Sequence, residues 1–292
     1  MALTPRRFPP IPRGAPCLMG IVNCTPDSFY DGGRFVSADD AVQQGLRLVE
    51  EGADVLDVGG ESTRPGAEPV PAQEEVRRVL PVLRGLARRT KVALSIDTMK
   101  AEVAEAALAE GATWVNDVTA LRHDPRLSKV VAKAGCLVVL MHMGHGGPKA
   151  MQLKPSYKDV VGEIRRFFSV RLRQFQNEGG DLRQVLIDPG FGFGKNLHHN
   201  LQLLRGLGSL SMLGRPLVVG VSRKSFLGRI LADQVGPDDL PLDKIPPPEA
   251  RLYASLAAQM WAAMSGATVL RVHDVRATRE FIRTWKTIAD AF

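Results

Sequence analysis

Side chains that can bind a ligand recur in this chain directly after short apolar runs. Asp97, Asn116 and Asp188 each follow such a run and can accept hydrogen bonds. Four donors stand in comparable places: Arg64, Lys224, Arg271 and His273. A carboxylate accepts two parallel hydrogen bonds from an amino-pyrimidinone edge, whereas arginine with lysine and histidine suits phosphate oxygens. These residue types predict a ligand with one end rich in N–H donors and one anionic end.

The segment DPGFGFGK, residues 188–195, resembles a phosphate-binding loop at first sight. A nucleotide P-loop needs four residues between its glycines and then a hydroxyl after the lysine, but only three separate Gly190 from Gly194, and Asn196 follows the lysine. The dinucleotide pattern fails as well, because a lysine replaces its last glycine. The segment is therefore interpreted as an acid at a strand end, followed by a loop with few side chains that can approach a ligand closely.

Apolar runs bounded by Gly, Pro, Asp or Asn alternate with segments of helical periodicity, which is the pattern of repeated βα units. The predicted strands are 18–23, 54–59, 92–97, 113–117, 136–141, 184–188, 216–221 and 268–272. The predicted helices are 38–51, 72–89, 100–110, 125–134, 156–178, 197–206, 248–265 and 276–290. Residues 233–250, rich in Pro and Asp, are interpreted as a surface insertion. Eight units without a composition break favour an α/β fold of one domain, the (β/α)8 TIM barrel, over two doubly wound halves.

A barrel of this kind carries its chemistry at the carboxyl ends of the strands, so the side chains named above would share one mouth. Any single Asp or Asn in that place is more often a helix N-cap, and only the whole set weakens that alternative. His142 and His145 flank a glycine-rich turn and are interpreted as loop or core histidines because no third metal ligand is evident. Cys24 is interpreted as a small buried residue.

Composition excludes several classes of protein. At 292 residues and 45% hydrophobic content, the chain can bury a substantial core. The net charge of +7 falls largely in helical surface patterns, so we expect no nucleic-acid partner. Three scattered cysteines indicate a reducing compartment and no structural zinc. Without an apolar targeting or membrane segment, a cytoplasmic protein is expected, with residues 1–17 as a leader and 18–292 as the domain.

Eight segments of the chain resemble, in order and spacing, the signature segments of the dihydropteroate synthase family. They are MGIVNCTPDSFYDGG, DVGGESTRPGA, SIDT, VNDV, MHM, DPGFGFGK, VSRKSFLG and RVHDV, and they extend over nearly the whole chain from Leu18 onward. The resemblance implies a TIM-barrel transferase that joins 6-hydroxymethyl-7,8-dihydropterin diphosphate to p-aminobenzoate and releases diphosphate. It also implies Mg²⁺ as cofactor, a place in folate biosynthesis, sulfonamides as inhibitors and a homodimer.

The same resemblance implies roles for single residues. Asp97, Asn116 and Asp188 match the pterin-binding residues, and Met141 would lie against the ring unless it only fills the core. Phe193 is expected as a wall beside the heterocycle. Lys224 would contact the pterin and help form the p-aminobenzoate site, and Ser225 would lie near the carboxylate of that substrate.

The remaining roles concern the diphosphate and the metal. Arg271 would pack over the pterin and, with His273, Asn23 and Arg64, hold the diphosphate. Asn23 and Asp31 match positions tied to magnesium. Thr63, Arg64 and Pro65 belong to the second loop of the family, and residues 25–33 to the first. The expected catalytic residues are Asn23, Asp31, Arg64, Lys224, Arg271 and His273.

Two other functions fit part of this pattern. A methyltetrahydrofolate methyltransferase that serves a corrinoid protein shares the acids and amide that match Asp97, Asn116 and Asp188. The segments STRPG, SRKS and RVHDV argue against it, because methyl transfer involves no diphosphate. A catalytically silent paralogue that binds a pterin without turnover is made less favourable by the complete set of cationic residues.

Overall fold

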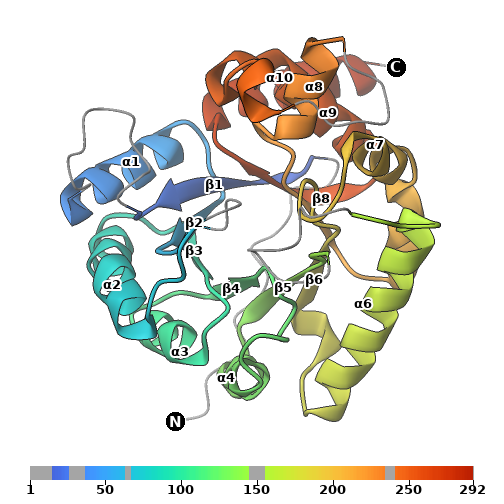
Figure 1. Cartoon of the computed structure of the whole chain (residues 1–292). Helices are drawn as coiled ribbons and strands as arrows, with labels where there is room; N and C mark the ends of the chain where they lie inside the picture. The colour runs from blue at the N-terminus through green and yellow to red at the C-terminus, as the bar shows by residue number, and fades with distance from the viewer. Residues whose placement is uncertain (1–14, 26–36, 63–66, 145–154, 234–240, 292) are drawn as a thin grey trace.

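Eight parallel strands close into one barrel, and neighbouring strands follow the order of the chain until β8 pairs with β1 (Figure 1). This computed structural model describes residues 15–25, 37–62, 67–144, 155–233 and 241–291. The strands are β1 (Cys17–Asn23), β2 (Val55–Gly59), β3 (Ala93–Asp97), β4 (Trp114–Asp117), β5 (Leu137–Met141), β6 (Val185–Asp188), β7 (Leu217–Val219) and β8 (Ala267–Val272). The predicted single-domain TIM barrel is confirmed.

Helices surround the strands on the outside of the barrel (Figure 1). They are α1 (Ala38–Glu50), α2 (Ala72–Arg89), α3 (Ala101–Ala109), α4 (Arg126–Ala134), α6 (Val160–Asn177), α7 (Leu197–Arg205), α8 (Ser225–Leu231), α9 (Leu252–Met264) and α10 (Val275–Ala289). Helix α8 was not among the predicted helices. Its seven residues, SFLGRIL, are too few to show two full turns of periodicity, and buried Phe226 and Leu227 stabilise it through tertiary packing.

Local signals explain where several helices begin. Ser37 caps α1 in a capping box with Asp40, and Asp159 accepts a hydrogen bond from the backbone N–H of Gly162 at the start of α6. Asn196 caps α7 in the same way with His199. His198 and His199 therefore lie in the first turn of α7.

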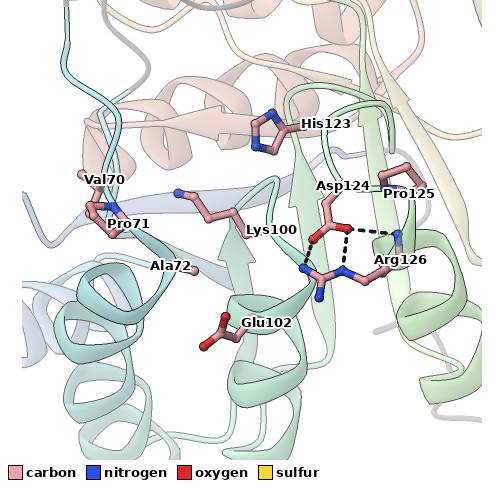
Figure 2. Close-up of a pocket in the computed structure, with 9 residues that line it drawn as sticks. All are labelled: Val70, Pro71, Ala72, Lys100, Glu102, His123, Asp124, Pro125 and Arg126. Atoms are coloured by element: carbon pink, nitrogen blue, oxygen red, sulfur yellow. Dashed lines mark hydrogen bonds and ion pairs between the residues drawn. The ribbon is translucent and has the colours of Figure 1, made fainter.

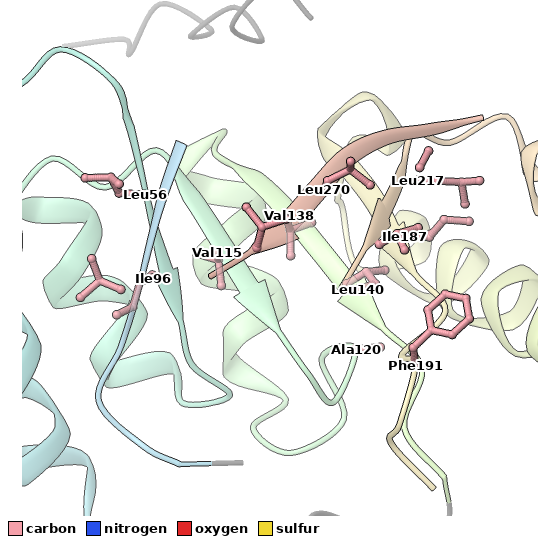
Figure 3. Packing of buried hydrophobic residues seen from close by; sticks show 14 of the residues in the cluster. Leu56, Ile96, Val115, Ala120, Val138, Leu140, Ile187, Phe191, Leu217 and Leu270 are labelled. Atoms are coloured by element: carbon pink, nitrogen blue, oxygen red, sulfur yellow. The ribbon is translucent and has the colours of Figure 1, made fainter. Parts of the chain in front are cut away.

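Strand alternation divides the core into two layers. Side chains such as Leu56, Val138 and Leu270 point outward and pack against the helices (Figure 3). The alternate positions form a separate apolar cluster inside the barrel: Cys17, Met19, Val55, Trp114, Leu137, Val139, Leu186, Val218 and Val269. This inner cluster is the floor on which the next layer of inward-pointing side chains lies.

Most predicted boundaries agree with the structure to within one residue, but α6 and α9 each begin four residues later than predicted, and among the strands β7 differs most. The prediction was 216–221, but the strand is confined to Leu217–Val219 and its register against β8 shifts between Leu217 and Val218. Pro216 has no backbone N–H for the ladder, and Gly220 gives the strand end no side chain to pack. In the described part of the chain, no helix is long and apolar enough to cross a membrane.

Candidate active site

A layer of polar side chains lies directly above the apolar floor at the carboxyl ends of the strands. Because side chains alternate along a strand, the residue two positions after an inward apolar residue also points inward. This places Asp57 after Val55 and Asn116 after Trp114. Asp188 and Arg271 follow Leu186 and Val269 in the same way. The period of the strands therefore gathers acids, an amide and a guanidinium at one end of the barrel.

Arg271 connects two of these acids. Its Nε donates to Asp57 Oδ2 at 2.7 Å, and its Nη2 donates to Asp97 Oδ2 at 2.8 Å. The Nδ2 of Asn116 donates to the same Asp57 oxygen at 2.9 Å. These charge-assisted bonds raise the pKa of Arg271, although burial opposes the rise. Arg271 is thus held as a cation in a fixed orientation.

Asp57 is the residue of this site that the sequence interpretation missed. Its side chain is fully buried, and its Oδ1 has no hydrogen-bond partner among the described residues. A signal was present, because a lone acid in the middle of the apolar run VLDVG is unfavourable unless it is paired or bound. Only the distant Arg271 and Asn116 reveal that pairing.

Asp97 and Asp188 are acids whose protonation is shifted by burial. Burial raises the pKa of Asp97 to about 7, with Arg271 opposing the rise and Asp57 adding repulsion. Burial likewise raises the pKa of Asp188 to about 6, although the hydrogen bond from the backbone N–H of Gly190 and the positive charge of Lys224 both lower it. Asp188 Oδ1 accepts that N–H at 2.7 Å. Its Oδ2 lies 4.0 Å from the position that a Cβ on Gly220 would occupy.

Lys224 and Phe193 form one side of the mouth. The Nζ of Lys224 lies 4.1 Å from the centroid of the Phe193 ring, in cation–π geometry. Burial, reinforced by the nearby charge of Arg271, lowers the pKa of Lys224 to about 8. Met141 packs in a small buried cluster with Val118 and Met143, against which Phe193 also packs. Met141 therefore both fills space in the core and lies beside the ring of Phe193.

The turn before α8 fixes the direction of Lys224. Arg223 adopts a left-handed φ of 59°, which is unfavourable for a side chain of this size. Its backbone N–H donates to Ser255 Oγ at 2.9 Å, and its guanidinium pairs with Asp274 at 2.5 Å. Ser225 is the first residue of α8, and its Oγ accepts a hydrogen bond from Arg229.

His273 and Asn23 lie at the ends of two neighbouring strands. Burial lowers the pKa of His273 to about 3, and the charges of Arg271 and Arg223 add to the effect, so the ring is neutral. Ser222 Oγ accepts the backbone N–H of His273 at 3.2 Å and lies 3.1 Å from its Nδ1. A Ser222 hydroxyl that donates to Nδ1 would leave the ring proton on Nε2, available to an anion. Asn23 ends β1 in register with Gly59 of β2.

The glycine loop turns its lysine inward. The Nζ of Lys195 is buried and donates to the carbonyl oxygens of Gly190 at 2.8 Å and Phe193 at 3.1 Å. His142 Nδ1 lies 3.1 Å from the same Nζ. Burial lowers the pKa of Lys195 to about 7. Lys195 therefore braces the loop rather than facing a phosphate, and His142 is a core histidine packed edge-on against Phe167.

The structure brings Asp97, Asn116, Asp188, Lys224 and Arg271 into one mouth with Met141, Phe193 and His273. Asp31, Thr63, Arg64, Pro65 and His145 lie outside the described residues, as do residues 26–33 of the expected first loop and residues 1–14 of the expected leader.

The fold and this mouth together define a TIM-barrel enzyme whose polar residues suit a polar heterocycle and an anion. The model of the family described as pterin binding enzyme matches residues 19–273. Dihydropteroate synthase of Escherichia coli K12 is 44% identical over 268 residues, which cover 92% of this chain and 90% of that protein.

Two solved structures have the same fold. A Xanthomonas albilineans dihydropteroate synthase with 4-aminobenzoic acid is 47% identical with a TM-score of 0.84, over 94% of this chain and 93% of that one. A Yersinia pestis dihydropteroate synthase with a sulfonamide drug is 43% identical with a TM-score of 0.86, over 94% and 95%. The chain belongs to the pterin binding enzyme family, among the dihydropteroate synthases, which are transferases of folate biosynthesis. The predicted family and activity are confirmed, and the corrinoid methyltransferase alternative is not supported.

Proposed function

We propose that the polar mouth of the barrel condenses 6-hydroxymethyl-7,8-dihydropterin diphosphate with p-aminobenzoate through the residues described above. The observation that carries this proposal is buried Asp188, whose Oδ1 accepts the backbone N–H of Gly190 while its Oδ2 faces Gly220, which follows β7 and has no side chain. A flat heterocycle can approach such an acid edge-on. Its 2-amino and N3–H groups would donate to Asp188, and Asp97 and Asn116 would bind its far edge.

The reaction requires stabilisation of a leaving anion more than a strong base. The C–O bond to diphosphate breaks, and its electron pair leaves with the diphosphate. The methylene cation that remains is stabilised by the electron-rich dihydropterin, and the amine lone pair of p-aminobenzoate then forms the new C–N bond. The amine proton passes to solvent. Because an arylamine is a neutral nucleophile at pH 7, positioning and electrostatics supply the catalysis.

Cations at the mouth would bind the diphosphate. Arg271 is fixed by two carboxylates and would offer its remaining N–H groups, and neutral His273 would donate from Nε2. Arg64 would contribute a third donor. Lys224 would contact the pterin and the p-aminobenzoate, with Ser225 near the carboxylate of the latter and Thr63 and Pro65 beside the same substrate.

Asn23 and Asp31 would hold Mg²⁺, which neutralises the charge of the diphosphate when it is bound. The donor set fits this ion, because Mg²⁺ binds few protein oxygens and completes its shell with water and phosphate. Asn23 offers an amide oxygen at the carboxyl end of β1. In the described ranges, no three His, Cys, Asp or Glu side chains gather as a metal site.

A homodimer in the cytoplasm belongs to the same proposal. Tyr253, Trp261 and Met264 of α9 are exposed, with Met212 exposed in the segment before β7. Exposed apolar side chains of this size on one helix favour a protein contact. All three cysteines are unpaired, which suits a reducing compartment. A monomeric mass in light scattering at micromolar concentration would contradict the dimer.

Inhibition by sulfonamides follows if the drug occupies the p-aminobenzoate site beside Lys224 and Ser225. Sulfonamide inhibition should then be competitive with p-aminobenzoate, and raising that substrate should restore the rate. A rate that stays low at saturating p-aminobenzoate would contradict a shared site.

Diphosphate release by the purified protein tests the proposal. The assay contains dihydropterin diphosphate, Mg²⁺ and p-aminobenzoate, and each is omitted in turn. Release that needs all three is expected, whereas pterin binding by calorimetry without release would indicate a silent paralogue. Arg64→Ala should reduce turnover much more than pterin affinity, and equal losses would contradict its assignment to the diphosphate.

A further inference from the structure

A buried group of three charges lies beside the mouth but outside the set of residues assigned to the substrates. The Nζ of Lys100 donates to Glu61 Oε2 and to Glu75 Oε2. The side chains of Lys100 and Glu61 are 14% and 11% exposed, and that of Glu75 is fully buried. We call Glu61, Lys100 and Glu75 the charge triad.

On one side, the charge triad holds both ends of the connection between β2 and α2. Glu61 follows the end of β2 by two residues, and its Oε1 accepts the backbone N–H of Val70 at 3.2 Å. Arg78 of α2 also donates to the carbonyl oxygen of Gly60 at 3.1 Å. A single carboxylate thus ties the residue where the connection leaves the barrel to a residue just before α2.

On the other side, the charge triad is anchored to the turn that carries Asp97. The backbone N–H of Thr98 donates to the carbonyl oxygen of Asn116 at 3.0 Å, and Thr98 Oγ1 accepts the N–H of Lys100 at 3.2 Å. Lys100 therefore has a fixed backbone three residues after Asp97. Figure 2 shows its side chain extending from the start of α3 toward Val70 and Pro71, along one wall of a pocket of about 370 Å³.

Stability alone does not account for three buried charges. Burial raises the pKa of Glu75, and the two carboxylates raise the pKa of Lys100 although burial opposes the rise. Replacement of a buried ion pair by apolar residues is often neutral or even stabilising, so a defined geometry is the contribution that we assign to these groups. Here that geometry links the acid Asp97 to both ends of the β2–α2 connection.

We propose that Lys100 is a positioning residue, which through Glu61 and Glu75 holds the described ends of the β2–α2 connection, at Glu61 and Val70, in register with the pterin-binding turn. The inference rests on the proposed function, because Thr63, Arg64 and Pro65 belong to that connection. The pterin would be bound by Asp97, three residues before Lys100, whereas Glu61, the partner of Lys100, precedes in sequence the residues assigned to the diphosphate and p-aminobenzoate. Loss of Lys100 should therefore misalign the substrates more than it weakens pterin binding.

The test compares Lys100→Met with the double variant Lys100→Met/Glu75→Gln. The single variant leaves two buried carboxylates without their cation, so a lower thermal midpoint is expected. The double variant removes one of these carboxylates and should recover most of that midpoint, but its kcat should stay at least about tenfold below the wild-type value, because small misplacements are costly in rate. Its Kd for the pterin diphosphate should change by less than about twofold, the difference expected when an interaction is not in the binding site.

Arg84→Met is the matched control. Arg84 and Glu110 form an ion pair of 2.7 Å that also joins α2 to the end of α3, but it is more exposed. This variant should keep the wild-type kcat. A double variant with a recovered midpoint and a wild-type kcat would overturn the inference.

Hydrogen–deuterium exchange of the Val70 amide gives a readout that does not depend on turnover. Exchange should be at least about tenfold faster in both Lys100 variants, because the local anchor is lost, and unchanged in Arg84→Met. Unchanged exchange in the Lys100 variants would overturn the inference even if kcat fell. If the wild type itself releases no diphosphate, the proposed function fails, while faster exchange would still support the anchoring by Lys100.

Discussion

Arg271 of β8 and Asp57 of β2 are joined by a 2.7 Å hydrogen bond between Nε and Oδ2, although 214 residues separate them in sequence. Asp57 is fully buried, and its partners are this guanidinium and the amide of Asn116. The pair affects two neighbouring charges of the mouth. The carboxylate of Asp57 favours the cationic form of Arg271, and its repulsion contributes to the raised pKa of Asp97.

Replacement of Asp57 by Asn should weaken binding of the dihydropterin diphosphate without abolishing the fold. The loss of charge-assisted hydrogen bonds of roughly 1.5–3 kcal/mol predicts a Kd about tenfold to a hundredfold higher by calorimetry. Asp54→Asn is the control, since Asp54 lies in the same chain segment just before β2 and pairs with Arg279 instead of Arg271. A similar loss of affinity in both variants would contradict a specific role for Asp57.

Pterin affinity should depend on pH through Asp188. Its pKa of about 6 means that the carboxylate is mostly ionised at pH 7.5 and mostly protonated at pH 5. The protonated acid cannot accept two N–H groups, so affinity should fall by up to about tenfold per pH unit below pH 6. Calorimetry from pH 5 to 8 measures the effect. Asp188→Asn should bind weakly and lose this part of the dependence, and a flat wild-type profile would exclude the assigned role.

Gly190→Ala should destabilise the protein strongly. Gly190 has φ of +69°, and an added Cβ would lie 1.9 Å from the carbonyl oxygen of His142. A left-handed backbone costs a side chain about 1–2 kcal/mol, and the clash with backbone adds to it. Gly214→Ala is the matched control, because Gly214 has φ of +64° and open space around it. Chemical denaturation should show a clearly larger loss of unfolding free energy for Gly190→Ala, and equal losses would contradict the clash.

Stability should fall at acid pH because of His273. Its folded-state pKa of about 3 lies below the ordinary value of 6.5, so between these values the unfolded state binds the proton more tightly. The contribution is complete above pH 6.5 and is lost by up to about 1.4 kcal/mol per pH unit as the pH falls toward 3. His273→Asn should lack this slope, whereas His198→Asn, at an exposed residue of α7, should keep it. Denaturation at several pH values measures both slopes, and parallel curves for all three proteins would refute the shift.

Local pattern was enough to predict the scaffold of the site. The strands were recognisable from short apolar runs and the long helices from their length and periodicity, with side-chain caps at the starts of α1, α6 and α7. Asp97, Asn116 and Asp188 could therefore be placed at strand ends from sequence alone. Helix α8 was not predicted because its seven residues are too few to show a helical periodicity. Asp57 was not predicted as a site residue because it lies inside a strand. The sequence does not show whether an acid at such a position faces the barrel interior or a helix.

The sequence by itself determined the barrel, the family and the end of the barrel at which the polar residues gather, because these depend on alternation, repeat and motif order along the chain. Only the tertiary structure decided which of these residues are partners. Arg271 pairs with Asp57 and Asp97 across 214 and 174 residues, and Lys100 pairs with Glu61 and Glu75 across 39 and 25. Such pairs, and the pKa shifts that burial imposes on them, arise when closure of the barrel removes water from charges that lie far apart along the chain.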